Sequence, residues 1–263
     1  MDMYPQRTLP GAESGPGWPD CGCALFFDFD GTLVDIAPTP ATVVVDPALP
    51  PLLQRLAQQL SGAVAIVSGR ALADIDALLG LPRLCAAGVH GAEWRALDSH
   101  VRRIPVPALK VAVAPLQQLC ARFPGLRLEH KPGALALHYR QAPELEAQCL
   151  QAMHDALQRV EGMALQRGKL VVELKPRGAS KAAAVRRFLE QRPFQHRRAW
   201  FFGDDVTDES AFEAVQAAGG VTVKVGEGET LAEYRLAGPR QVRDWIEAAV
   251  DRLETGGGRG LAP

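Results

Sequence analysis

The stretch Phe26-Phe27-Asp28-Phe29-Asp30-Gly31-Thr32-Leu33 places two carboxylates, two residues apart, at the end of an apolar run. A second acidic stretch, Gly203-Asp204-Asp205-Val206-Thr207-Asp208-Glu209, follows another apolar run far along the chain. Short apolar runs that stop at a turn-forming glycine are typical of buried parallel strands. In open α/β sheets the ligand lies beyond the carboxyl ends of the strands, so we expect both acidic stretches at one edge of a sheet.

This concentration of negative charge predicts a metal site. Carboxylates at close range repel one another unless a cation neutralises them, and oxygen ligands without Cys or His suit a hard cation such as Mg²⁺. We therefore expect Mg²⁺ to be bound by Asp28, Asp30 and Asp204, with the main-chain carbonyl of Asp30 facing the cation. Asp205 and Asp208 are expected to hold metal-bound waters or to orient a nearby lysine.

The composition is typical of a globular protein and not of a nucleic-acid or membrane binder. Apolar residues make up 47% of the 263 residues and charged residues 22%, which allows a sizeable core. The net charge of −1 supplies no electropositive field for nucleic acid or membrane, and no apolar run is long enough to cross a bilayer. Five cysteines scattered through apolar segments indicate reduced thiols.

The two ends of the chain lack the patterns of regular structure. Residues 1–20 show almost no apolar periodicity, and they lack the basic start and apolar centre of a secretory signal. We expect a disordered leader over 1–20, on a cytoplasmic protein, and a loose glycine-rich tail over 255–263.

Elements of a parallel α/β domain flank both acidic stretches. Strands and helices alternate there, which implies a parallel sheet with right-handed crossovers. We therefore predict a core domain formed by 21–103 and 176–254. Its predicted helices span 51–60, 71–79, 180–191, 209–217 and 241–253, and its later strands span 63–67, 84–87, 199–202 and 220–225.

Between 104 and 175 the pattern changes to that of a smaller domain. Helices are expected over 109–123 and 143–160. Each is followed by two strands with turn residues between them, 126–131 with 134–140 and 163–167 with 170–175. Helices on one side of paired strands indicate an α+β cap inserted in the parallel domain.

The residues at the predicted sheet edge suit phosphate-ester hydrolysis. Asp28 can act as a nucleophile, which divides the reaction into two easier displacements. Asp30 lies on the same side of an extended chain and can protonate the leaving oxygen, then accept a proton from water. Ser68 and Lys181 are expected to hold the phosphoryl oxygens. In isolation, Ser68 would be interpreted as a helix cap and Lys181 as a surface residue.

In chain order, these residues resemble the four motifs of the haloacid dehalogenase superfamily of phosphatases, over 24–225. Within it, the chain is similar to the trehalose-6-phosphate phosphatases. The resemblance implies a Rossmann-like core, a mobile cap, and Mg²⁺-dependent hydrolysis of trehalose 6-phosphate through an aspartyl-phosphate, with a trehalose-6-phosphate synthase as a possible supplier. The narrower resemblance rests on Ile66-Val67-Ser68-Gly69-Arg70, Gly88-Val89-His90-Gly91-Ala92-Glu93, Glu129-His130-Lys131-Pro132 with Tyr139-Arg140, and residues 203–209.

One face of the predicted cap sheet collects polar side chains, because charged residues alternate with leucines over 126–131. A solvated sheet face is the ordinary alternative. The resemblance instead implies sugar binding and cap closure. The segment 175–181 departs from the family pattern, which leaves the role of Lys175 open. The residues expected to bind substrate are Arg70, Glu129, Lys131, Arg140, Lys169 and Glu173.

Two kinds of alternative function remain open at this point. The chain could be another capped sugar phosphatase acting on sucrose phosphate or a mannosyl phosphate, or a phosphomannomutase. It could also be a catalytically silent module that binds a sugar phosphate or a synthase. A silent module has no physical reason to keep Asp28, Asp30, Lys181 and Asp204 at one strand edge, since buried charges are costly.

Overall fold

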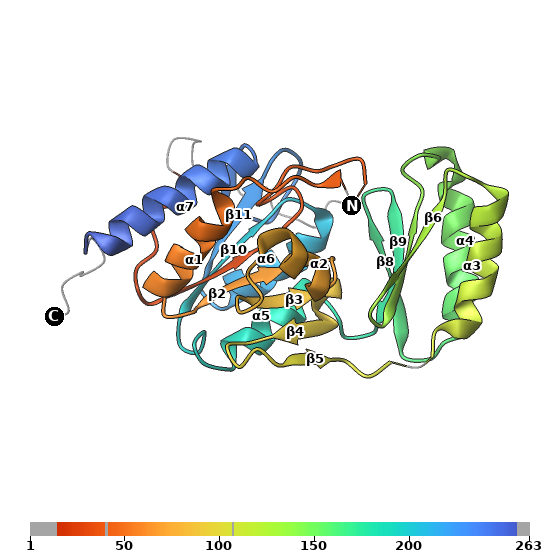
Figure 1. Cartoon of the computed structure of the whole chain (residues 1–263), viewed down its shortest axis with the longest axis horizontal. Coiled ribbons are helices and arrows are strands. Elements are labelled where there is room, and N and C mark those ends of the chain that lie inside the picture. The colour runs from red at the N-terminus through yellow and green to blue at the C-terminus, as the bar shows by residue number, and fades with distance from the viewer. Residues whose placement is uncertain (1–14, 40–41, 107, 257–263) are drawn as a thin grey trace, which may run out of the picture.

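Two separate sheets organise the chain (Figure 1). The computed structural model describes residues 15–39, 42–106 and 108–256. Within these residues, the larger sheet consists, in spatial order, of β12 (Tyr234–Leu236), β11 (Val221–Val225), β10 (Arg198–Gly203), β1 (Cys23–Phe27), β2 (Val64–Val67), β3 (Cys85–Gly88), β4 (Glu93–Arg95) and β5 (Val101–Arg103).

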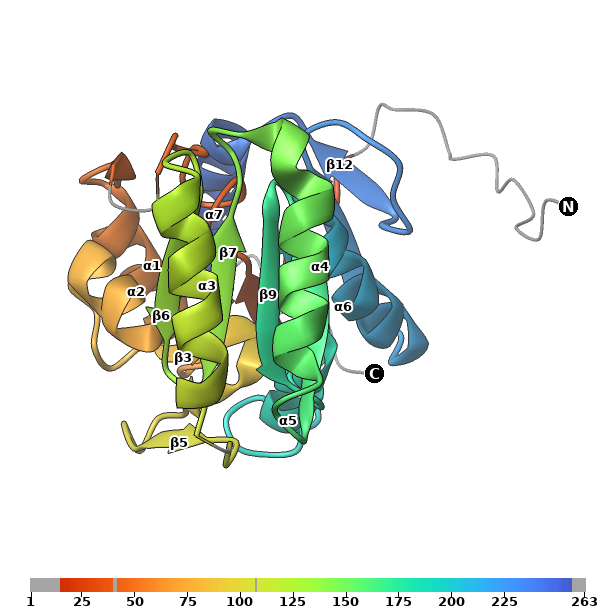
Figure 2. The ribbon, with the colours of Figure 1, turned by 90° about the vertical axis from the view of Figure 1, so that its right-hand side faces the viewer.

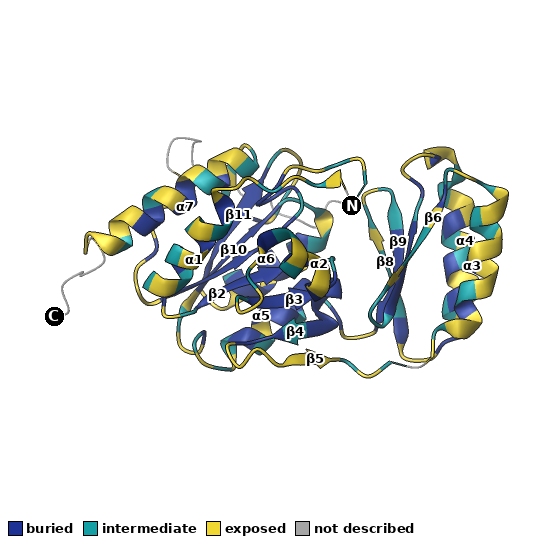
Figure 3. Cartoon of the chain, viewed as in Figure 1, coloured by how far each residue is buried: buried dark blue, intermediate teal, exposed yellow. Residues whose placement is uncertain are grey.

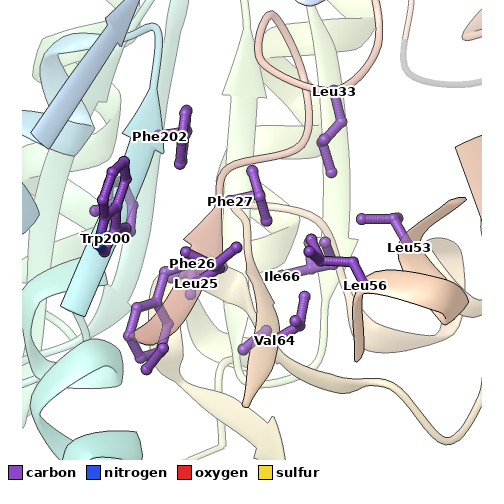
Figure 4. Close-up of a cluster of buried hydrophobic side chains, with 14 of the residues drawn as sticks. Leu25, Phe26, Phe27, Leu33, Leu53, Leu56, Val64, Ile66, Trp200 and Phe202 are labelled. Carbon is purple, nitrogen blue, oxygen red and sulfur yellow. The ribbon is translucent and has the colours of Figure 1, made fainter. Parts of the chain in front are cut away.

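The centre of this sheet is parallel and buried on both faces. β1 pairs with β10 on one side and β2 on the other, and the register places Phe27 beside Phe202 and Ile66. All five residues of β1 are buried. The rings of Phe27 and Phe202 stack with their centroids 4.8 Å apart, inside the apolar cluster drawn in Figure 4. Burial on both faces explains why these strands are continuous apolar runs.

Helices cover both faces of the larger sheet. The chain runs outward from β1 to β2 and β3, then returns to β10 and β11 on the other side of β1. Right-handed crossovers therefore place the first two helices and the next two on opposite faces, as Figure 2 shows for α1 and α2 on the left and α6 on the right. The helices are α1 (Leu49–Gln59), α2 (Leu72–Leu79), α5 (Lys181–Leu189), α6 (Val206–Ala217) and α7 (Pro239–Glu254), and α7 packs on α1.

The smaller sheet is antiparallel and lies between the core and two helices of its own (Figure 1). Leu116, Leu137, Met153 and Val172 belong to a second apolar cluster beneath these helices, whose outer faces are exposed (Figure 3). In spatial order the strands are β6 (Arg127–Lys131), β7 (Ala134–His138), β9 (Val171–Pro176) and β8 (Met163–Gly168), and the helices are α3 (Lys110–Arg122) and α4 (Glu146–Leu157). The cap therefore has its own core.

The predicted fold class, a Rossmann-like parallel core with an inserted α+β cap, is confirmed. The exact domain limits stay a prediction. The structure adds β4, β5 and β12, which the apolar pattern did not indicate, and it begins the 143–160 helix with a 3-10 turn over Pro143–Leu145. α6 begins at Val206, before the predicted 209, because Asp205 caps it.

The predicted leader and tail fall partly outside the described residues, which exclude 1–14 and 257–263. Residues 15–20 contact α7, where Trp18 stacks on Trp245 with ring centroids 6.1 Å apart. Trp245 Nε1 also donates a hydrogen bond to the carbonyl of Gly17. All five cysteines are free thiols. Among the described helices, none is both long and apolar enough to span a bilayer.

Candidate active site

The two acidic stretches meet at the carboxyl edge of the larger sheet. Asp28 directly follows β1, and Asp204 directly follows the neighbouring parallel strand β10. Gly31 makes their approach possible, since it has a φ of +81° and a Cβ there would lie 2.1 Å from Asp204 Oδ2. A side chain at this position would collide with the carboxylate and strain the backbone. The sequence Asp-Phe-Asp-Gly thus shapes the edge as well as supplying its charges.

Lys181 joins the carboxylates from the first turn of α5. Its Nζ lies 2.8 Å from Asp28 Oδ1 and 2.7 Å from Asp208 Oδ1, and the side chain is buried. Burial alone would lower the pKa of Lys181, but the charges of Asp208 and Asp28 raise it well above its usual value. Lys181 therefore remains a cation at the floor of the site.

Burial and the crowding of these carboxylates raise the pKa values of Asp28 and Asp204. Burial raises the pKa of Asp28 well above its usual range, the Lys181 charge opposes this, and Asp208 and Asp204 add to the increase. Burial, followed by the charge of Asp208, raises the pKa of Asp204 to about 6. One lysine thus does not compensate three carboxylates in this pocket.

A divalent cation fits this donor set. Asp28, Asp204 and Asp208 each place a carboxylate oxygen within 4.8 Å of the others'. Asp204 Oδ1 is buried and has no hydrogen-bond partner among the described residues. A cation would supply the missing partner and the missing positive charge, and all-oxygen donors suit a hard ion.

Asp30 is held apart from this carboxylate group by Arg70. Arg70 Nε and Nη2 donate to the two oxygens of Asp30 at 2.6 and 2.7 Å. The hydroxyl of Ser68 accepts from the backbone N–H of Arg70 at 3.1 Å. The loop after β2 therefore fixes Asp30 beside Asp28, with its side chain turned toward an arginine.

A cavity of about 360 Å³ lies between the core edge and the cap sheet. Both the carboxyl ends of the core strands and the inner face of the cap line it. Asp208 does not line the cavity, but it binds Lys181, which does. The predicted site residues that line it are Asp28, Asp30, Ser68, Arg70, Glu129, Lys131, Arg140, Lys169, Glu173, Lys181, Asp204 and Asp205.

Cap residues reach across this cavity to the core. Lys131 Nζ donates to the carbonyl of Gly69 at 2.9 Å and to Glu173 Oε1 at 2.5 Å. Arg140 Nη1 donates to the carbonyl of Ala37 at 3.1 Å. Two cap cations thus bind main-chain oxygens of core loops and join the cap to the core across the cavity.

Several lining residues were absent from the predicted set. His138 Nε2 lies 2.7 Å from Glu129 Oε2, a pair that the shared polar face of the two strands could have indicated. His90 and Gln166 also line the cavity. Lys175 turns away from it and donates to the carbonyl of Ala179, where burial lowers the pKa of Lys175 to about 8.

Comparison with known proteins gives consistent results. The family model described as "Trehalose-phosphatase" matches residues 26–240. The chain is 44% identical to the trehalose-6-phosphate phosphatase of Escherichia coli over 88% of each chain. It is 43% identical to a probable trehalose-phosphate phosphatase of Sinorhizobium fredii over 77% of each.

Solved structures share the fold. A trehalose-6-phosphate phosphatase related protein, 27% identical, superposes with a TM-score of 0.73 over 89% of this chain and all of that one. The C-terminal domain of the Candida albicans trehalose-6-phosphate phosphatase has a TM-score of 0.76 at 23% identity, over 88% of this chain and 92% of that chain, which shows the fold alone. With most of its length matched by the family model and by close relatives in sequence, the chain belongs to the trehalose-phosphatase family.

Proposed function

We propose that this protein hydrolyses trehalose 6-phosphate to trehalose and inorganic phosphate. The observation that carries the proposal is one cavity with two unlike ends. At the core end, Asp28 lies beside Lys181 and two further carboxylates, as phosphoryl transfer requires. At the cap end, charged and polar side chains of β6, β8 and β9 face the same space, as recognition of a sugar requires.

The first step transfers the phosphoryl group to Asp28. An Asp28 oxygen attacks phosphorus while the bond from phosphorus to the sugar oxygen breaks, and Asp30 donates its proton to that oxygen. Arg70 binds both oxygens of Asp30, so this ion pair must loosen for Asp30 to carry the proton. The guanidinium then lies beside the cavity, where it can bind the substrate.

The second step returns Asp28 to its starting form. Asp30 takes a proton from water as the water oxygen attacks phosphorus, and the bond from Asp28 to phosphorus breaks to release phosphate. Ser68 and Lys181 donate hydrogen bonds to the phosphoryl oxygens in both steps. Asp208 keeps Lys181 in place, and Asp205 orders this edge by capping α6.

Mg²⁺ is the cation that we propose for the acidic group. Asp28, Asp204 and the main-chain carbonyl of Asp30 would hold it. Asp208, which is paired with Lys181 outside the cavity lining, adds negative charge nearby. When bound, it supplies charge neutralisation for the carboxylates and for the phosphoryl oxygens. This keeps Asp28 ionised, which nucleophilic attack requires, in a pocket whose burial otherwise raises its pKa.

The cap end gives the reaction its proposed sugar selectivity. Glu129, Lys131, Arg140, Lys169 and Glu173 are proposed to bind hydroxyl groups of the disaccharide. An analogue that lacks a hydroxyl leaves buried polar groups without a partner, which weakens its transition state. Closure of the cap over the bound substrate also excludes bulk water from the reacting phosphate.

The fold alone does not separate an enzyme from a silent module. The C-terminal domain of a Candida albicans trehalose synthase regulatory protein shares the fold with a TM-score of 0.65 at 16% identity, over 86% of this chain and 93% of that chain. The intact set of Asp28, Asp30, Lys181 and Asp204 favours the enzyme here.

A panel of phosphate esters tests the proposed function. Purified protein with Mg²⁺ is incubated with trehalose 6-phosphate, sucrose 6-phosphate, a mannosyl phosphate and an aryl phosphate, and released phosphate is measured. We expect trehalose 6-phosphate to react fastest and a chelator to stop the reaction. A faster reaction with another sugar phosphate, isomerisation without release, or no Mg²⁺-dependent release would each contradict the proposal.

A further inference from the structure

The segment after β3 has an unusual backbone. Val89, His90 and Gly91 have φ values of 49°, 53° and 91°, three consecutive left-handed residues. A β-branched valine avoids this region, so such a conformation persists only where the surroundings enforce it. The backbone N–H of Val89 donates to the carbonyl of Arg70 at 2.8 Å, and that of His90 donates to the carbonyl of Ser68 at 2.9 Å. The strained segment is thus bound to the loop that fixes Asp30.

This backbone points the His90 side chain out of the core and into the cap. His90 Nε2 lies 2.6 Å from Glu173 Oε2 of β9, and His90 Nδ1 lies 3.3 Å from Gln166 Nε2 of β8. Since the amide nitrogen only donates, Nδ1 accepts and the ring proton lies on Nε2, 2.6 Å from Glu173 Oε2. Burial lowers the pKa of His90, against the opposing charge of Glu173, which agrees with a neutral ring.

The same ring packs against the phosphate-side loop. A Cβ at position 69 would lie 2.7 Å from His90 Nε2, so the contact requires glycine there. The carbonyl of Gly69 accepts from Lys131, which also donates to Glu173. Gly69, Lys131, Glu173 and His90 therefore close a ring of contacts, in which two residues come from the core and two from the cap.

We propose that His90 is a positioning residue that couples sugar recognition in the cap to the loop Ser68-Gly69-Arg70 on the phosphate side. The inference rests on the proposed function and deepens it. A fitting sugar that binds Glu173 and Lys131 holds them in these positions, and His90 and Gly69 are then fixed between them. Because this loop carries Ser68 and Arg70, the phosphate contacts and the orientation of Asp30 then depend on the sugar.

Two amide substitutions separate this role from a structural one. His90→Asn keeps a residue that tolerates the left-handed backbone, but its amide is too short to replace the Nε2–H donor. His90→Gln places an amide nitrogen as many bonds from the backbone as Nε2 and can still donate to Glu173. His154→Asn is the matched control, because His154 is exposed on α4 and its ring binds the Leu150 carbonyl of its own helix.

The measurement is the ratio of kcat/KM for trehalose 6-phosphate to that for a small aryl phosphate, which does not extend to the cap. We expect His90→Asn to lower this ratio by roughly tenfold, since the buried carboxylate of Glu173 loses its close contact with the ring. His90→Gln should recover most of the loss, and His154→Asn should leave the ratio at the wild-type value. Equal losses on both substrates, or no recovery with glutamine, would overturn the coupling role.

A double-mutant cycle adds an independent test. If His90 acts through Glu173, then Glu173→Gln and the double variant Glu173→Gln with His90→Asn should show nearly the same ratio. Additive losses would overturn the inference. Wild-type protein that releases no phosphate from trehalose 6-phosphate would overturn the proposed function itself, whereas wild-type turnover with an unchanged ratio in His90→Asn overturns only the coupling.

Discussion

The core edge and the cap face line one cavity, yet they hold their charges differently. In the core, the side chains of Lys181, Asp28 and Asp208 are 3, 6 and 0% exposed, and Lys181 Nζ lies within 2.8 Å of both carboxylates. In the cap, Glu129 and His138 are 21 and 23% exposed, and they belong to neighbouring strands of a sheet with its own apolar core. A buried charge group fails as a unit, whereas a partly exposed pair such as Glu129 and His138 can change one residue at a time. Lys131 and Glu173, 8 and 7% exposed, resemble the core group instead. We therefore expect reaction chemistry to be fixed in the core and selectivity to be adjustable in the cap.

The largest expected effect comes from Asp28→Asn. The substitution removes the nucleophile and keeps the shape of the side chain, so turnover should fall by about 10⁴-fold or more on both trehalose 6-phosphate and the aryl phosphate. Phosphate release measures the loss, and circular dichroism checks that the fold persists. Undiminished turnover on either substrate would show that the core edge does not carry the chemistry.

Lys181→Met tests whether the core charges form one unit. Without the lysine, two buried carboxylates lose their counter-charge. We therefore expect activity on both substrates to be lost. We also expect the free energy of unfolding to fall by about 3–5 kcal/mol. Urea unfolding without added metal measures it. Lys110→Met, at an exposed position on α3, is the control and should change stability little. A similar small loss for Lys181→Met would break the contrast between the two regions.

Glu129→Ala tests the cap side of the comparison. We expect kcat/KM for trehalose 6-phosphate to fall by roughly 10- to 100-fold and that for the aryl phosphate to fall far less, because only the sugar reaches this face. Glu161→Ala, at an exposed position outside the cavity lining, is the matched control. Equal losses on both substrates would remove Glu129 from sugar recognition.

The smallest expected effect is a pH dependence of stability that belongs to His90. Burial holds its pKa below the usual 6.5. As the pH falls through 6.5, the unfolded chain therefore gains a proton that the folded protein does not bind, and the folded state loses stability. Urea unfolding between pH 7.5 and 5.5 should show a steeper loss for wild type than for His90→Gln. If the free energy of unfolding depended on pH equally in both proteins, the pH dependence would not belong to His90.

The sequence predicted the core edge better than the cap contacts for a physical reason. Asp28, Asp30 and Asp204 each follow an apolar strand directly, so local sequence and sheet topology together place them. Asp208 is the second partner of Lys181 because α6 begins at Val206, three residues before the predicted start. The cap formed by Asp205 causes this earlier start. Periodicity does not indicate such a cap, although the Asp205-to-Asp208 spacing is that of a capping box.

β4 was missed because its polar residues are buried in pairs. β4 contains Glu93 and Arg95, which are 1 and 3% exposed. Glu93 accepts from the backbone of Leu72, and Arg95 binds Asp76 with two hydrogen bonds of 2.7 Å. Apolar patterning does not predict a strand of this kind, since partners distant in sequence satisfy its charges. His90 belongs to a stretch that carries the family resemblance, but no role was predicted for it, because its partners lie on cap strands.

The stacking of Trp18 on Trp245 has an optical consequence. Trp245 also lies 5.6 Å from Trp200 and 4.7 Å from Phe202, measured between ring centroids, and the chain has four tryptophans, none of them between 104 and 175. Indole fluorescence therefore reports on the packing of the phosphatase core, while the cap contributes to far-ultraviolet dichroism without contributing indole emission. A melting curve that differs between the two signals would reveal a cap that loosens before the core, without any added label.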